Sequence, residues 1–190
     1  MFGIPITERG HRIIQDYIKE GDTAVDCTAG RGEDTLFLAE RVGSSGTVYA
    51  LDIQDEAIEG LHQRFDEAYP QVIICRANNR DFEGCLALEG RGSAPQVIMY
   101  NLGYLPGGDH SVTTRVEDSL QSARAACDSV KRGGLISIIA YPGHPEGAVE
   151  AEQIEAFLRA LPSREYEVLT IRQTNRSASA PVQHLIFRKK

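Results

Sequence analysis

Two glycines and two aspartates have the spacing of a nucleotide-binding turn. The glycines follow an apolar segment in the pattern Asp26-x-x-x-Gly30-x-Gly32. Glycine lets the backbone adopt positive φ and approach a ligand with no Cβ in the way. A helix predicted to start just beyond would offer unpaired N–H groups to a negatively charged group. Asp52 ends the next apolar segment, where a carboxylate can accept both hydroxyls of a ribose.

Two cofactor classes use a turn of this kind. Dinucleotide-binding folds have a third glycine, in the pattern G-x-G-x-x-G, and that position is Thr35 here. Folds that bind S-adenosylmethionine (SAM) have an acidic residue on the first strand, which Asp26 supplies. The turn therefore favours SAM, with a nicotinamide dinucleotide as the alternative. A simpler alternative stays open, in which the glycines only turn the chain and Asp26 only caps the helix.

A candidate acceptor site follows the fourth apolar segment, in the run NLGYLPGGD (101–109). The run resembles the [DN]-P-P-[YF] motif of SAM-dependent methyltransferases that act on amino groups. Asn101 and Tyr104 match that motif, whereas Leu102 and Gly103 replace its prolines. An amine must point its lone pair at the methyl carbon, so we expect Asn101 to hold its hydrogens and Tyr104 to stack on the acceptor. The alternative is a plain glycine–proline turn.

Two polar side chains follow the third apolar segment, and ligands of doubly wound sheets lie beyond the carboxyl ends of the strands. Asn79 or Asp81 could therefore hydrogen-bond an adenine edge. Asp81 could equally cap the next helix, and the sequence leaves both roles open.

The loop YPGHPEG (141–147) follows the fifth apolar segment and carries a histidine to the same edge of the sheet. We expect His144 or Asp109 to help an acceptor lose a proton, with water as a sufficient substitute. A purely structural role for His144 stays open. The other histidines are expected to be structural, and His11 lies on an amphipathic segment that could cover the cofactor.

Apolar and amphipathic segments alternate along the chain, which predicts parallel strands covered by helices. The strands are expected at 23–29, 47–53, 71–77, 95–102 and 134–141, and the helices at 33–42, 57–65, 115–132 and 148–161. Two further strands, 165–174 and 181–189, have no helix between them and predict an antiparallel hairpin. The fold class is therefore α/β: a Rossmann-like, seven-stranded, mostly parallel sheet with a C-terminal hairpin and helices on both faces. We expect a single domain over residues 1–190.

Composition narrows the class of protein. The 190 residues carry a net charge of −7, whereas nucleic-acid-binding proteins usually present a basic surface. Any affinity for RNA should therefore be weak, with a shallow salt dependence. No apolar run is long enough to span a membrane, and the N-terminus has no apolar signal segment. We therefore expect a cytoplasmic protein with no membrane partner. The four cysteines lack metal-site spacing, which predicts reduced thiols and no metal.

The motifs together resemble the YtqB-like (MnmM-like) family of rRNA-methylase-type proteins. The resemblance spans nearly the whole chain and rests on D-x-T-x-G-x-G-x-D-T-x-F-L-A (26–39), ALDIQ (50–54), NLGYLPGGD (101–109) and YPGHPEG (141–147). It implies a class I SAM-dependent methyltransferase of bacterial tRNA. Members methylate the amine of 5-aminomethyl-2-thiouridine at the wobble position of the anticodon loop, and they are homodimers.

The motifs predict roles for individual residues. We expect catalytic roles for Asn101, Tyr104, His144 and Asp109, and contacts with SAM from Asp26, Thr28, Gly30, Gly32, Asp34, Asp52, Gln54, Asn79 and Asn101. The chain departs from the family at Arg31, where Asn is common, and at Asn78 and Asn79, where Ser-His is common.

Three rival functions stay open at this stage. One is a SAM-dependent methyltransferase of ribosomal RNA or of a small-molecule amine. The second is an RNA- or ribosome-binding protein whose SAM pocket is not catalytic, and the third is a nicotinamide-dependent oxidoreductase. A pocket that had lost its function would be expected to lose its motif residues. The motifs retain Asp26, Gly30, Gly32, Asp52 and Asn101, which argues against this rival.

Overall fold

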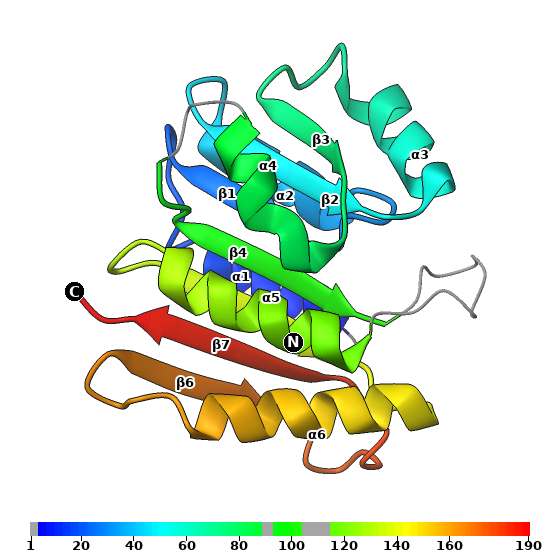
Figure 1. Ribbon diagram of the computed structural model, residues 1–190, viewed down its shortest axis with the longest axis vertical. Coiled ribbons are helices and arrows are strands. Elements are labelled where there is room, and N and C mark those ends of the chain that lie inside the picture. The colour runs from blue at the N-terminus through cyan, green and yellow to red at the C-terminus, as the bar shows by residue number, and fades with distance from the viewer. Residues whose placement is uncertain (1–3, 89–92, 104–114) are drawn as a thin grey trace.

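One mixed sheet organises the protein in the computed structural model, which describes residues 4–88, 93–103 and 115–190 (Figure 1). Its order is β3-β2-β1-β4-β5-β7-β6. The strands are β1 (Thr23–Asp26), β2 (Thr47–Asp52), β3 (Val72–Arg76), β4 (Val97–Leu102), β5 (Leu135–Ala140), β6 (Tyr166–Ile171) and β7 (Val182–Arg188).

The pairing of the strands confirms the predicted topology. Strands β1 to β5 run parallel to one another, whereas β7 is antiparallel to both β5 and β6. The chain moves outward from β1 to β3 on one side and then returns to place β4 on the other side of β1. The order of strands thus reverses between β1 and β4, and this reversal opens a crevice at their carboxyl ends.

Helices cover both faces of the sheet (Figure 1). One face carries α4 (Phe82–Leu88), α5 (Val116–Ser129) and α6 (Pro145–Arg159), and the other carries α1 (Ile6–Ile14), α2 (Glu33–Val42) and α3 (Asp55–Phe65). A short 3₁₀ turn, η1 (Asn79–Asp81), precedes α4. Within the described ranges, no helix combines the length and apolar character needed to cross a membrane.

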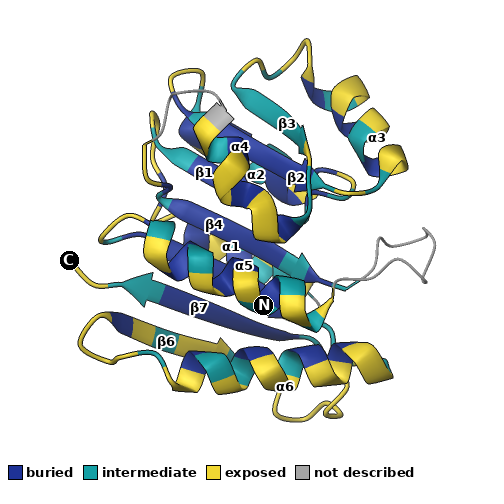
Figure 2. Ribbon diagram, in the orientation of Figure 1, coloured by how far each residue is buried: buried dark blue, intermediate teal, exposed yellow. Residues whose placement is uncertain are grey.

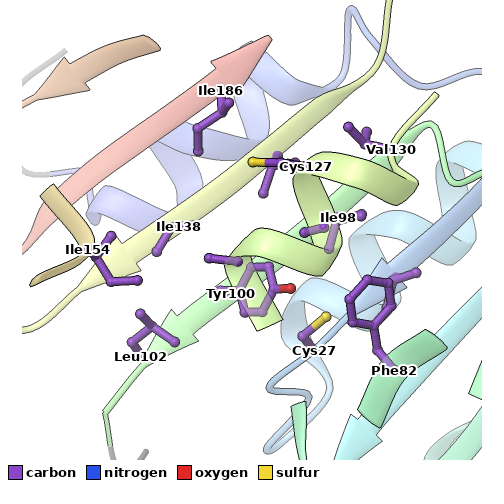
Figure 3. Close-up of a cluster of buried hydrophobic side chains, with 14 of the residues drawn as sticks. Cys27, Phe82, Ile98, Tyr100, Leu102, Cys127, Val130, Ile138, Ile154 and Ile186 are labelled. Atoms are coloured by element: carbon purple, nitrogen blue, oxygen red, sulfur yellow. The ribbon is translucent and has the colours of Figure 1, made fainter. Parts of the chain in front are cut away.

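The core is divided by the sheet because successive strand residues point to opposite faces. On β1, Val25 packs under α5 with Ile98 and Tyr100, whereas Ala24 packs on the α1 and α2 side with Met99. Figure 2 shows these central strands as almost wholly buried, and Figure 3 shows the cluster around Tyr100. Burial on both faces explains why the strands read as continuous apolar runs.

Most predicted boundaries differ from the structure by a few residues, and the starts of α6 and α1 are two clear cases. Helix α6 begins at Pro145 rather than at residue 148, because proline suits the first turn of a helix and the His144 side chain caps it. Helix α1 begins at Ile6, upstream of the predicted amphipathic segment. Asp81 ends η1 directly before α4, and the side chain of Asn78 accepts the capping hydrogen bond of η1 from the Arg80 amide.

The cysteines are thiols, as predicted. Cys27, Cys85 and Cys127 are buried, and Cys75 is half-buried. Burial raises the pKa of the Cys127 thiol to about 12 and the pKa of Cys27 well above its usual value. Since the thiolate is the reactive form, burial makes these two thiols unreactive.

The turn after β1 requires glycine at position 32, and a substitution there tests this requirement. Gly32 has φ of 81°, and a Cβ there would lie 2.6 Å from the Phe65 ring and 2.9 Å from Leu61. We predict that Gly32→Ala lowers the free energy of unfolding by about 2–4 kcal/mol, from left-handed backbone strain plus overpacking. Urea denaturation measures the change.

Gly60 provides the matched control. It lies inside α3, and a Cβ there would meet no atom within 4 Å. Gly60→Ala should therefore leave stability unchanged or raise it by up to about 1 kcal/mol. Equal effects of the two substitutions would contradict the geometry assigned to the turn.

Candidate active site

A cavity of about 870 Å³ opens at the carboxyl ends of the parallel strands. The segments that line it follow β1, β2, β3, β4 and β5 in turn, and α1 closes one side. Among the predicted site residues, the cavity brings together Thr28, Gly30, Asp34, Asp52, Gln54, Asn79, Asn101 and His144. The volume lies within the range of small-molecule and cofactor sites.

The glycine turn is held against β2 by a carboxylate. Gly30, with φ of 50°, donates its N–H to Asp52 Oδ2 at 2.9 Å. The other oxygen, Oδ1, accepts the N–H of Gln54 at 2.9 Å. Each carboxylate oxygen has a second lone pair, so Asp52 fixes the turn and can still accept ribose hydroxyls.

Asp26 supports the same turn from below. Its side chain is fully buried, accepts hydrogen bonds from the Thr28 N–H at 3.2 Å and the Thr35 hydroxyl at 2.7 Å, and does not line the cavity. Asp26 was predicted to contact SAM or to cap the helix; its contacts instead hold the turn, from a position outside the cavity lining. Desolvation, together with the negative charge of Asp34, raises the pKa of Asp26 from 3.8 to about 7.

Asn101 is tied to the turn through its backbone and its side chain. Its N–H donates to Thr28 Oγ1 at 2.7 Å, and its side-chain Nδ2 donates to Asp34 Oδ2 at 2.6 Å. The remaining amide atom, Oδ1, is buried and has no hydrogen-bond partner within the described ranges. A buried acceptor without a partner is costly, so this atom is suited to a ligand donor.

The other oxygen of Asp34 is held by a residue that the sequence did not single out as functional. His11 Nε2 lies 2.6 Å from Asp34 Oδ1, and the imidazole stacks on Phe37 with centroids 4.0 Å apart. His11 therefore lines the cavity from α1. No sequence motif links residues 11 and 34, because the two meet only when α1 packs beside α2.

Asn79 is the only one of the two adenine candidates that lines the cavity. Its backbone oxygen accepts from Ser122 Oγ at 2.7 Å, which fixes the turn η1 on α5. Its side-chain Oδ1 is buried without a partner in the part of the chain that the structure describes. Asp81 is exposed and lies outside the cavity lining.

His144 lines the cavity and also caps α6. Its Nδ1 accepts the Gly147 N–H at 3.1 Å, which requires a ring without a proton on that nitrogen. The same Nδ1 lies 3.3 Å from a Glu146 carboxylate oxygen, a contact that requires a proton on Nδ1. The two contacts therefore need different tautomers of the ring and exclude each other.

Two predicted catalytic residues, Tyr104 and Asp109, lie outside the described residues. An aromatic ring nevertheless lines the cavity at Tyr141, for which the sequence motifs predicted no role. Burial, together with the charge of Asp34, raises the pKa of the Tyr141 hydroxyl, so the phenol is neutral at physiological pH. Thr7, Ile53, Arg115 and Ser179 also line the cavity without having been predicted.

The sheet order, the C-terminal hairpin and this cavity define a SAM-dependent methyltransferase of class I. The family model described as "Putative rRNA methylase" matches residues 48–187, and the chain belongs to this family. The membership confirms the resemblance seen in the motifs, and it excludes the oxidoreductase alternative.

Individual relatives agree with the family. The chain is 35% identical to a "tRNA (mnm(5)s(2)U34)-methyltransferase, chloroplastic" from Arabidopsis thaliana, over 96% of this chain and 69% of that protein. The crystal structure of a "putative rRNA-methylase" from Clostridium thermocellum has a TM-score of 0.91 and 31% identity, covering 99% of this chain and 100% of that one. The fold is also shared by a putative methyltransferase from Streptococcus mutans "in complex with SAH", with a TM-score of 0.82, 22% identity and 99% of each chain covered.

The raised pKa of Asp26 predicts a pH-dependent stability. The folded state holds a proton up to about pH 7 that the unfolded state releases near pH 3.8, so the free energy of unfolding falls as pH rises between these values. We predict that Asp26 contributes a fall of about 2 kcal/mol between pH 5 and pH 7.5.

Asp26→Asn tests this contribution because its amide can accept from the Thr28 N–H and donate to the Thr35 hydroxyl. Urea denaturation at the two pH values should show a smaller fall for this variant than for the wild type. The same pH dependence in both proteins would contradict a protonated Asp26.

Proposed function

We propose that this methyltransferase acts on tRNA and methylates the amine of 5-aminomethyl-2-thiouridine at the wobble position, giving the 5-methylaminomethyl form. The Arabidopsis relative is named for mnm(5)s(2)U at position 34, which is this product. The observation in the structure that supports an amine acceptor is Asn101 Oδ1, a buried oxygen without a partner among the described residues at the edge of the cavity.

The residues of the cavity fit SAM on this chain's own geometry. The positive-φ turn at Gly30 leaves room for the methionine part, whereas Gly32 faces Phe65 and Leu61 and does not line the cavity. Asp52 can accept the ribose hydroxyls, and Asn79 Oδ1 can accept from the adenine amino group. When bound, SAM supplies a methyl group on a positively charged sulfur, open to in-line attack by a nucleophile.

The acceptor must be held and deprotonated. Asn101 Oδ1 can accept one N–H of the amine and so fix the direction of the nitrogen lone pair. A primary alkylamine is mostly protonated at neutral pH, as a lysine is, so one proton must leave before attack. Since Nδ1 of His144 is occupied by the α6 cap, release of this proton to water requires no rearrangement of the site.

The described part of the structure offers few free basic side chains around the cavity to bind RNA. Arg31, Arg80 and Arg115 line the cavity, but Arg80 already pairs with Asp118 at 2.9 Å. A wobble base lies in a loop, so it can enter a pocket without the unpairing energy that flipping from a duplex costs. Action on the anticodon loop therefore requires few phosphate contacts. A homodimer and a cytoplasmic location remain predictions.

The first experiment is methyl transfer from labelled SAM to bulk tRNA from cells that lack this protein. We expect label in wobble 5-methylaminomethyl-2-thiouridine, identified by nucleoside mass spectrometry. Label in ribosomal RNA alone, which the family description would suggest, would contradict the proposal. Normal SAM binding with no transfer to any RNA would point to a small-molecule amine or a non-catalytic pocket.

Asn101→Ala tests the acceptor contact. We predict a fall in kcat of about 100-fold with the Kd for SAM changed less than threefold, because the amide positions the nucleophile. Calorimetry with SAM and single-turnover transfer to tRNA measure the two quantities. Gln15→Ala removes an exposed amide outside the cavity and serves as the control, with no expected change. Full activity of Asn101→Ala would contradict the assignment.

A further inference from the structure

Three side chains from three separate elements form a continuous hydrogen-bonded chain at the cavity. His11 on α1 contacts one oxygen of Asp34 on α2, and Asn101 on β4 contacts the other, each at 2.6 Å. Both distances are at the short end for N–H···O bonds, as expected when the acceptor is charged. The chain ends at Asn101 Oδ1, the amide atom without a partner in the described ranges.

The chemistry of a carboxylate fixes the orientation of both neighbours. An ionised carboxylate only accepts hydrogen bonds, so the Asn101 atom facing Asp34 must be Nδ2 and the His11 nitrogen must carry its proton. The amide is thereby turned so that its oxygen is the atom available to a ligand. With a neutral partner at position 34, the two amide orientations would be closer in energy.

Asp34 also carries its charge in a nearly closed environment. It is 6% exposed, and its charge contributes to the raised pKa of both Asp26 and Tyr141. Such a charge needs donors on both oxygens. The stacking of His11 on Phe37 holds the imidazole in the plane that serves one of them, and the amide of Asn101 serves the other.

We propose that His11 and Asp34 are positioning residues for the methyl acceptor: together they lock the Asn101 amide with Oδ1 toward the amine. The proposal rests on the proposed function, in which an amine is the nucleophile. It assigns Asp34 to acceptor geometry rather than to SAM binding, the role predicted from the sequence. It also gives His11 a part in the reaction.

Three variants separate these roles. Asp34→Asn keeps the size of the side chain but removes the charge that selects the amide orientation. His11→Phe keeps a ring to stack on Phe37 but cannot donate, and His11→Gln keeps an N–H donor without the ring. We expect kcat to fall about 10- to 100-fold in Asp34→Asn and His11→Phe. The Kd for SAM should change less than threefold, and His11→Gln should recover part of the loss.

His62→Ala is the matched control, because His62 pairs with Asp66 at 3.0 Å on the exposed face of α3, outside the cavity. It should leave kcat and KM unchanged. An Asp34→Asn variant that binds SAM weakly but transfers methyl normally at saturating SAM would overturn the proposal and make Asp34 a cofactor ligand. Wild-type kcat in both Asp34→Asn and His11→Phe would overturn it as well.

A readout without turnover separates this proposal from the proposed function. In ¹⁵N-labelled protein the Asn101 side-chain NH₂ should exchange slowly with solvent, and the protection should be lost in Asp34→Ala. Protection that is independent of Asp34 would overturn the lock. A protected amide in a wild-type enzyme that binds SAM but does not methylate the wobble amine would instead contradict the proposed function alone.

Discussion

The site depends on one constraint: a backbone turn with two left-handed glycines must be held rigid between β1 and α2. Two of its N–H groups are satisfied by carboxylates, that of Gly30 by Asp52 on the neighbouring strand and that of Thr28 by Asp26. Those of Ala29 and Gly32 donate to backbone carbonyls. Both aspartates end parallel strands, so the carboxyl edge of the sheet supplies the partners that the turn needs. Without them, the buried turn would leave unpaired donors, which are costly.

Gathering carboxylates has an electrostatic consequence. Asp34 and Asp52 both raise the pKa of Asp26, since three acids close together resist full ionisation. The carboxylates of Asp34 and Asp52 at the cavity stabilise positive ligands, and both the sulfonium of SAM and an alkylammonium acceptor are positive. The charges that make the protein acidic overall, at −7, therefore suit its small ligands better than the phosphates of an RNA.

The features that could be predicted from the sequence are those set by hydrophobic periodicity and by turn residues. Helix α2 has the predicted bounds because Gly32 and Gly43 flank its two ends. The doubly wound sheet with its hairpin was predicted from the alternation of apolar and amphipathic segments. The sequence did not predict the contact of His11 with Asp34, because that contact forms through tertiary packing between residues 23 apart with no shared motif. Nor did it reveal that His144 caps α6, since a histidine in a Gly/Pro loop has no capping signature.

The most direct test of the central claim is a structure of the protein with S-adenosylhomocysteine and an anticodon stem-loop carrying wobble 5-aminomethyl-2-thiouridine. The account predicts the amine nitrogen at about 3 Å from Asn101 Oδ1, with Nδ2 still bonded to Asp34. An amine held elsewhere in the cavity, or a wobble base outside it, would contradict the account.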